Sequence, residues 1–162
     1  MNNSIEYFEE YMKIALEEAQ CAYREDEVPV GAVIVESGRI LSRTHNRNRQ
    51  YADPTAHAEI LALREASKNK GVFRLTESDM FITVEPCPMC AGAIIYSRIK
   101  RVIYGCADYK AGCDVSVMNI LNNEKFNHRT EVIRNIKEFD CKKILQDFFK
   151  TKRLKKYAGV DY

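Results

Sequence analysis

The sequence predicts an α/β fold, a three-layer α/β/α sandwich around a mixed sheet, and three observations carry this prediction. Two short β-branched runs lie close together near the start of the chain, which is typical of a hairpin. After them, segments of strand and helix character alternate, which indicates parallel strands joined by helices. The chain has 162 residues, 46% of them hydrophobic, which is enough for a sizeable core. We therefore expect residues 1–162 to form a single domain.

A helix and a hairpin are predicted for the first part of the chain. Residues 5–24 carry one apolar stripe at spacings of three and four, and Asn3 followed by Glu6 resembles a capping box. Residues 32–35 and 40–43 flank a Ser-Gly pair, so they are expected to form two strands joined by a tight turn. The helical stripe consists of Ile5, Phe8, Met12, Ala15, Ala19 and Ala22.

A second helix is predicted over residues 56–69. Gly71 lies just beyond its end, where glycine commonly terminates a helix. Pro54 suits the first helical position, with Asp53 or Thr55 as the cap.

Two strands, a weaker strand and two helices are predicted for the rest of the chain. The strands are residues 80–84 and 101–105, with a weaker candidate at 131–135. Residues 88–97 form a helix with almost no polar face, so it packs either in the core or against another subunit. A basic C-terminal helix is expected over about residues 140–158.

Composition excludes several classes of protein. A chain with 30% charged and 46% hydrophobic residues is not disordered, and no apolar run approaches the roughly 20 residues that cross a bilayer. The first ten residues are acidic and polar, unlike a secretory or transit signal, so a cytoplasmic location without membrane contact is expected. In that reducing compartment, six cysteines favour metal ligands or redox groups over disulfides.

Charge is distributed unevenly along the chain. The net charge is +2, yet residues 1–81 sum to −4 and residues 82–162 to +6, which indicates either an anionic partner for the second half or ordinary surface scatter. The C-terminal helix is compatible with RNA, because Phe149 can stack on a base, and equally with a solvated helix. Its cations are Lys142, Lys143, Lys150, Lys152, Arg153, Lys155 and Lys156.

Two short stretches carry the chemistry. His57 and Glu59 lie at the start of the second helix, and Cys87 and Cys90 lie between the strand 80–84 and the next helix. Residues three apart share a helix face, so both sulfurs can reach one ion, and a helix N-terminus favours thiolates. Zinc binds thiolate and imidazole ligands, and three protein ligands leave its fourth position for water, which is the catalytic arrangement.

Glu59 is the candidate proton carrier for such a site. On an ideal helix, residues two apart point about 200° from one another, so His57 and Glu59 can meet one site only if both lie in or just before the first turn. Two alternatives stay open. The cysteine pair alone fits a thiol redox protein, and a zinc site with a fourth protein ligand fits a non-catalytic RNA-binding module.

These motifs resemble a known family. His-x-Glu followed by Pro-Cys-x-x-Cys is the pattern of the zinc nucleobase deaminases, and the chain is similar to TadA-type tRNA-specific adenosine deaminases over about residues 11–153. The segments that carry the likeness are 27–33, 46–47, 53–60, 85–93, 127–129 and 147–149.

The resemblance implies an activity and a set of roles. The activity is hydrolytic deamination of adenosine to inosine at wobble position 34 of a tRNA anticodon stem-loop, with tRNA-Arg as the expected substrate. The implied fold is cytidine deaminase-like, with a five-stranded mixed sheet, assembled as a homodimer. A deaminase of free guanine, cytosine or a nucleoside is the nearest alternative. The implied roles are zinc binding by His57, Cys87 and Cys90, proton transfer by Glu59, base contacts by Asn46, Ala58, Val28 and Pro86, and anticodon contacts by Asp108, Lys110, Phe149 and Arg153.

Overall fold

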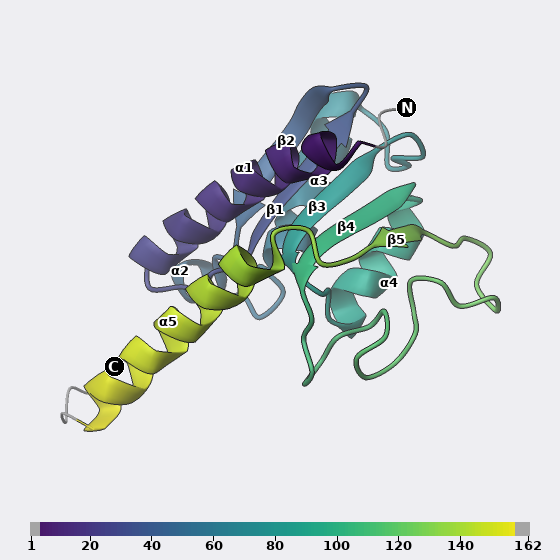
Figure 1. The fold of residues 1–162 in the computed structure, drawn as a ribbon. Helices are drawn as coiled ribbons and strands as arrows, with labels where there is room; N and C mark the ends of the chain where they lie inside the picture. Colours follow the sequence, from purple (N-terminus) through teal and green to yellow (C-terminus); the bar gives the residue numbers. More distant parts are fainter. Residues whose placement is uncertain (1–3, 158–162) are drawn as a thin grey trace.

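The computed structural model describes residues 4–157 and contains one five-stranded sheet (Figure 1). Its strand order is β2-β1-β3-β4-β5. The antiparallel pairs are β1–β2 and β1–β3, whereas β3–β4 and β4–β5 are parallel, which confirms the predicted mixed sheet. The strands are β1 (Gly31–Glu36), β2 (Arg39–His45), β3 (Asp79–Val84), β4 (Arg101–Cys106) and β5 (Glu131–Ile133).

Helices cover both faces of the sheet and complete the predicted three layers. Figure 1 shows α1 (Ile5–Arg24, purple) and α5 (Glu138–Tyr157, yellow) on one face, with α3 (Ala58–Lys70) and α4 (Pro88–Ser97) on the other. A short helix, α2 (Asn48–Tyr51), follows β2. Two buried clusters fill the spaces between the layers.

The alternation of side chains along the strands divides the core. In β1, Ala32 and Ile34 pack in the cluster under α3 and α4, whereas Val33 and Val35 pack in the cluster under α1. Gly31 begins this strand directly against α1, where a Cβ atom would lie 1.9 Å from the carbonyl oxygen of Ala15. Only glycine fits where the two backbones come this close, so Gly31 allows α1 to pack directly against the start of β1.

Several predicted details differ in the structure. The capping box at Asn3 is wrong, because Ser4 caps α1 and accepts a hydrogen bond from the backbone N–H of Tyr7, while Asn3 lies outside the described residues. The predicted helix 56–69 begins later, at Ala58, and its cap is His57. Asp53 or Thr55 is therefore not its cap, and Pro54 is not its first residue; the helix has the later start that a meeting of His57 and Glu59 favours.

The observed ends of one helix and one strand differ from the predicted ends because of local backbone conformation. Asp53 Oδ1 accepts the backbone N–H and the hydroxyl of Thr55, which makes a turn before α3 rather than its first helical turn. The last strand stops at Ile133, and Asn135 then adopts a left-handed conformation with a φ of 64°. That conformation cannot continue a strand.

Acidic side chains are buried at opposite ends of β3. Asp79, at its start, accepts hydrogen bonds from the guanidinium of Arg101 and, at 3.0 Å, from the hydroxyl of Tyr7. Glu85 directly follows its last residue and lies near the cysteines. None of the helices within residues 4–157 has the length and apolar character of a membrane span.

Candidate active site

The N-termini of α3 and α4 meet beyond the carboxyl end of β3. His57 is the N-cap of α3, and Cys87 is the N-cap of α4, with Pro88 at the first helical position. Helix N-termini carry partial positive charge and unpaired N–H groups, so the point where they meet favours anions and thiolates. This is the edge at which open α/β sheets place their ligand sites.

Three potential metal ligands converge there. The Nδ1 atom of His57 lies 3.7 Å from the Sγ of Cys87 and 3.5 Å from the Sγ of Cys90. These three ligand atoms all lie within 4.8 Å of one another. The imidazole therefore faces both sulfurs, and a single ion could contact all three atoms.

Glu59 joins this group because of where α3 begins. His57 has an extended backbone, with φ −71° and ψ 149°, so it precedes the helix, whereas Glu59 lies in the first turn. The 200° separation expected within a helix therefore does not apply to this pair. Glu59 is buried, at 4% exposure, and its Oε2 atom has no hydrogen-bond partner among the described residues.

The protonation equilibria of the four groups are coupled. A hydrogen bond from Cys90, together with one from His57, lowers the pKa of Cys87 to about 4. The pKa of Cys90 is raised by the same thiol–thiolate hydrogen bond and by burial, and that of His57 is raised by its hydrogen bond to Cys87. Burial raises the pKa of Glu59. The protein thus favours a thiolate at Cys87 and opposes charge on Glu59.

The donor set fits a zinc ion. Two sulfurs and one imidazole nitrogen are ligand types that zinc prefers, and three protein ligands are the number found in catalytic zinc sites. A buried carboxylate oxygen without a partner is unfavourable, and a water at the same site would satisfy it. His57, Cys87 and Cys90 therefore fit as ligands of a zinc ion with one position left for water, and the Glu59 carboxylate lies beside them.

Asn46 links the site to the β2 end of the sheet. Its Oδ1 atom accepts the backbone N–H of Ala58, the first residue of α3, at 2.8 Å. This leaves the amide NH₂ group as a donor for a ligand. The carbonyl of Ala58 accepts the hydroxyl of Thr44, so both backbone groups of Ala58 have partners within the protein. The substrate contact expected from Ala58 stays a prediction.

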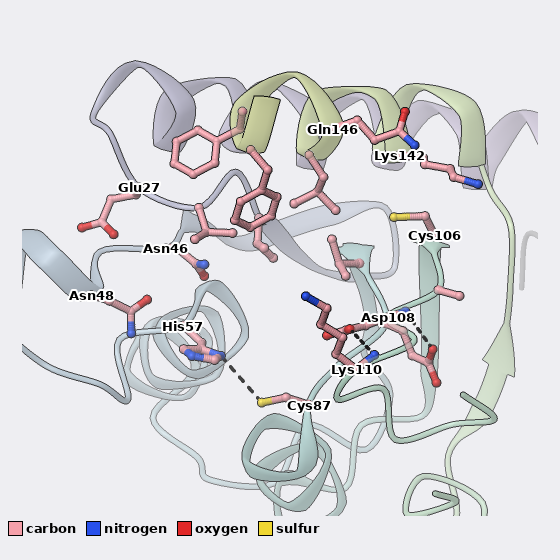
Figure 2. A pocket seen from close by; sticks show the side chains of 18 of the residues that line it. Glu27, Asn46, Asn48, His57, Cys87, Cys106, Asp108, Lys110, Lys142 and Gln146 are labelled. Carbon is pink, nitrogen blue, oxygen red and sulfur yellow. Dashed lines mark hydrogen bonds between the residues drawn. The ribbon is translucent and has the colours of Figure 1, made fainter. Parts of the chain in front are cut away.

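A cavity of about 1030 Å³ lies over these residues. Figure 2 shows His57 and Cys87 in it together with Asn46, Asp108 and Lys110, and with Gln146 and Lys142 on α5. The cavity thus joins the possible metal site to the C-terminal helix. The predicted site residues that line it are Val28, Asn46, His57, Glu59, Cys87, Asp108, Lys110 and Phe149.

Other predicted residues lie outside the cavity lining. Cys90 is fully buried, and Pro86 is buried with its carbonyl accepting the backbone N–H of Cys113. Arg153 is exposed on α5, beyond the residues that line the cavity. Arg153 can therefore contact an RNA only if that RNA extends beyond the residues that line the cavity.

The α5 lining was partly missed by sequence reasoning. Lys142, Phe149 and Lys152 were named from the sequence, whereas Gln146, which also lines the cavity, was not. The available signal was its spacing of four from Lys142 and three from Phe149, which places these residues on one helix face. Lys152 also pairs with Asp26, at 2.5 Å, which ties α5 to the turn after α1.

A second group of possible ligands is occupied by the protein itself. Glu18 and His45 contact each other at 2.7 Å, and Cys21 lies beside them. Glu18 also accepts a hydrogen bond from Arg43, and Cys21 accepts one from Arg24. The cations of these arginines oppose a metal ion at this place.

Comparison with known proteins agrees with this geometry. Residues 6–153 match the model of the MafB19-like deaminase family. The chain is 45% identical over 149 residues to the tRNA-specific adenosine deaminase of Bacillus subtilis, covering 92% of each chain.

Solved structures place the fold. One from a study of A-to-I editing by tRNA:A34 deaminases at the wobble position of transfer RNA is 41% identical, with a TM-score of 0.81, covering 84% of this chain and 99% of that chain. A guanine deaminase from Nitrosomonas europaea, at 21% identity, shares the fold with a TM-score of 0.74, covering 86% of this chain and 83% of that chain. The predicted deaminase-type sandwich is confirmed. The chain belongs to the MafB19-like deaminase family and, among deaminases, to the tRNA-specific adenosine deaminases.

Proposed function

We propose that this protein deaminates adenosine to inosine, hydrolytically, at wobble position 34 of a tRNA anticodon loop. The observation that carries the proposal is the meeting of His57, Cys87 and Cys90 with Glu59 at a cavity of about 1030 Å³. The carboxylate of Glu59 is buried, and its Oε2 atom has no hydrogen-bond partner within residues 4–157. An anticodon loop suits this cavity because its bases are unpaired, so turning one out of the stack costs little.

His57, Cys87 and Cys90 would hold one zinc ion per subunit. Zinc bound in this way lowers the pKa of a coordinated water to near 7, which makes a nucleophile available at neutral pH. The depressed pKa of Cys87 favours its thiolate form, and the thiolate is the form that binds metal.

Glu59 would move the protons of the reaction. Its Oε2 atom is free to accept a proton, and burial raises its pKa, so the protonated form is accessible during turnover. Glu59 would take a proton from the attacking water and deliver it to adenine N1 as the C6–O bond forms. It would then take the remaining proton of that oxygen and deliver it to the amino group as the C6–N bond breaks. Adenosine and water are thereby converted to inosine and ammonia.

Other residues would position the base and the RNA. The amide NH₂ of Asn46 would donate to the purine edge, since its oxygen is held by Ala58, and Val28 would provide an apolar wall. Lys110 and Phe149 would contact neighbouring nucleotides by charge and by stacking. Pro86, Asp108 and Arg153 complete the proposed substrate contacts, and tRNA-Arg is the proposed substrate.

A homodimer is proposed as the assembly. The helix α4 is almost entirely apolar, yet its Tyr96 side chain is 85% exposed. Val115, Val117 and Met118 are exposed in the long connection between β4 and β5. Several exposed apolar side chains favour a protein–protein interface, and a second copy of this chain would cover them. A cytoplasmic location stays a prediction.

The test is ammonia release by the zinc-loaded protein. We expect release from an anticodon stem-loop RNA with adenosine at position 34, and none from the same RNA with guanosine there, from free guanine or from free cytidine. Inosine in the product RNA would identify the reaction. Release from free guanine alone would favour the nucleobase deaminase and contradict the proposal.

A further inference from the structure

Glu85 is a buried carboxylate in the segment that joins β3 to the two cysteines. It is 2% exposed. A carboxylate so placed must be compensated by hydrogen bonds, because its transfer out of water is costly. The partners of Glu85 are therefore informative about what this residue holds in place.

The hydrogen bonds to the Glu85 carboxylate all come from one loop, residues 108–116. The Oε1 atom accepts the backbone N–H groups of Asp114, Val115 and Ser116, at 2.9, 3.0 and 3.2 Å. The Oε2 atom accepts the backbone N–H of Asp108, at 3.1 Å, and the hydroxyl of Ser116. Five hydrogen bonds to one carboxylate are charge-assisted and define the path of residues 108–116.

The first part of this loop is a tight turn built on the carboxylate of Asp108. Asp108 Oδ1 accepts the N–H groups of Lys110 and Ala111, at 2.9 and 3.2 Å. Gly112 lies directly against Glu85, where a Cβ atom would be 2.3 Å from the carboxyl group. Asp108 and Lys110, which this turn orients, are labelled in Figure 2 among the side chains that line the cavity.

We propose that Glu85 is a positioning residue for the RNA substrate. It holds the loop 108–116 so that Asp108 and Lys110 stand at the cavity, and it lies two positions before Cys87. The orientation of the RNA-contacting loop is thereby tied to the segment that carries the proposed zinc ligands. This inference rests on the proposed function for its substrate, whereas the ordering of the loop by Glu85 does not depend on it.

The test compares Glu85→Gln with Asp79→Asn in the full-length protein. Both variants replace a buried carboxylate at one end of β3, but Asp79 lies at the end away from the cavity. For Glu85→Gln we expect faster hydrogen exchange at the amides of residues 108–116 and about a tenfold rise in KM for the anticodon stem-loop RNA, with zinc content and kcat largely kept. Asp79→Asn is expected to lower the melting temperature without either effect.

Gly112→Ala provides a second perturbation that leaves the charge of Glu85 intact. The added methyl group displaces the carboxylate, so the same rise in exchange and KM is expected even if Glu85→Gln does not fold. The positioning role would be overturned if Glu85→Gln or Gly112→Ala folds with unchanged amide hydrogen exchange at residues 108–116. It would also be overturned if the KM of that variant is no higher than the KM of Asp79→Asn. If the wild-type protein releases no ammonia from RNA, the proposed function fails, and the exchange measurement still tests the hold of Glu85 on the loop.

Discussion

Glu59 and His57 illustrate how one backbone conformation decides the chemistry of a motif. Two positions apart within a helix, their side chains would diverge. His57 instead precedes α3 with an extended backbone, and Glu59 occupies the first turn. The carboxylate is thus buried next to the cysteines rather than on the outer face of the helix.

Replacing Glu59 tests its role in proton transfer. Glu59→Gln keeps the shape of the side chain and removes the acid, so we expect a loss of about 10²–10⁴-fold in kcat with zinc content unchanged. Glu65→Gln, an exposed position of the same helix, is the matched control and should keep wild-type activity. A Glu59→Gln enzyme within a few-fold of wild type would exclude this residue as the proton carrier.

Replacing Cys87 tests metal binding. Cys87→Ser removes one of three ligands, so we expect the purified variant to lose most of its zinc, measured by elemental analysis. Cys21→Ser, at a cysteine already hydrogen-bonded by Arg24, should keep a full equivalent. Full zinc occupancy in Cys87→Ser would contradict the ligand assignment.

At the scale of the element, periodicity predicted helices well and their capping poorly. The bounds of α1 and α4 follow from the spacing of apolar residues and from Pro88. The start of α3 depends on Asn46, twelve positions earlier, which accepts the N–H of Ala58. The short α2 is likewise capped from a distance, since the Glu27 carboxylate accepts the N–H groups of Arg49 and Gln50. Such long-range caps have no local pattern.

The two sides of α5 are expected to respond differently to mutation. Phe149 is 45% exposed and lines the cavity, whereas Ile144 is buried against the core. We expect Phe149→Ala to weaken binding of the anticodon stem-loop by about tenfold, because base stacking is worth about 1–3 kcal/mol. Ile144→Val should cost about 1 kcal/mol of unfolding free energy and leave RNA binding unchanged. Equal RNA affinities for wild type and Phe149→Ala would remove this helix from the proposed interface.

At the scale of the molecule, the sequence motifs predicted which residues form the site, but they did not predict the path of the long connection between β4 and β5. The ligand spacing brought His57, Cys87 and Cys90 into one hypothesis, and the structure places their ligand atoms together. The connection from 107 to 130 follows no periodic pattern, because it is shaped by contacts such as those of Glu85 rather than by a repeating apolar face. Its fold was therefore not predictable from spacing.

The uneven charge of the chain predicts a salt-dependent interaction with RNA. The dissociation constant for the stem-loop should rise steeply with salt as phosphate contacts are lost. Lys110→Gln, at the cavity, should lower the slope of log K against log salt by about 0.7, the value for one single-strand contact. Lys68→Gln, exposed on α3 and outside the cavity lining, is the control. A slope unaffected by Lys110→Gln would mean that this lysine makes no phosphate contact.

The proposed function depends on an open zinc site formed by His57, Cys87 and Cys90 beside the buried acid Glu59. X-ray absorption spectroscopy at the zinc edge of the purified protein tests it most directly. We expect two sulfur ligands at about 2.3 Å and two lighter ligands at about 2.0–2.1 Å, one of them an exchangeable water oxygen. A third sulfur, a second histidine, or a preparation that binds no zinc would contradict the account.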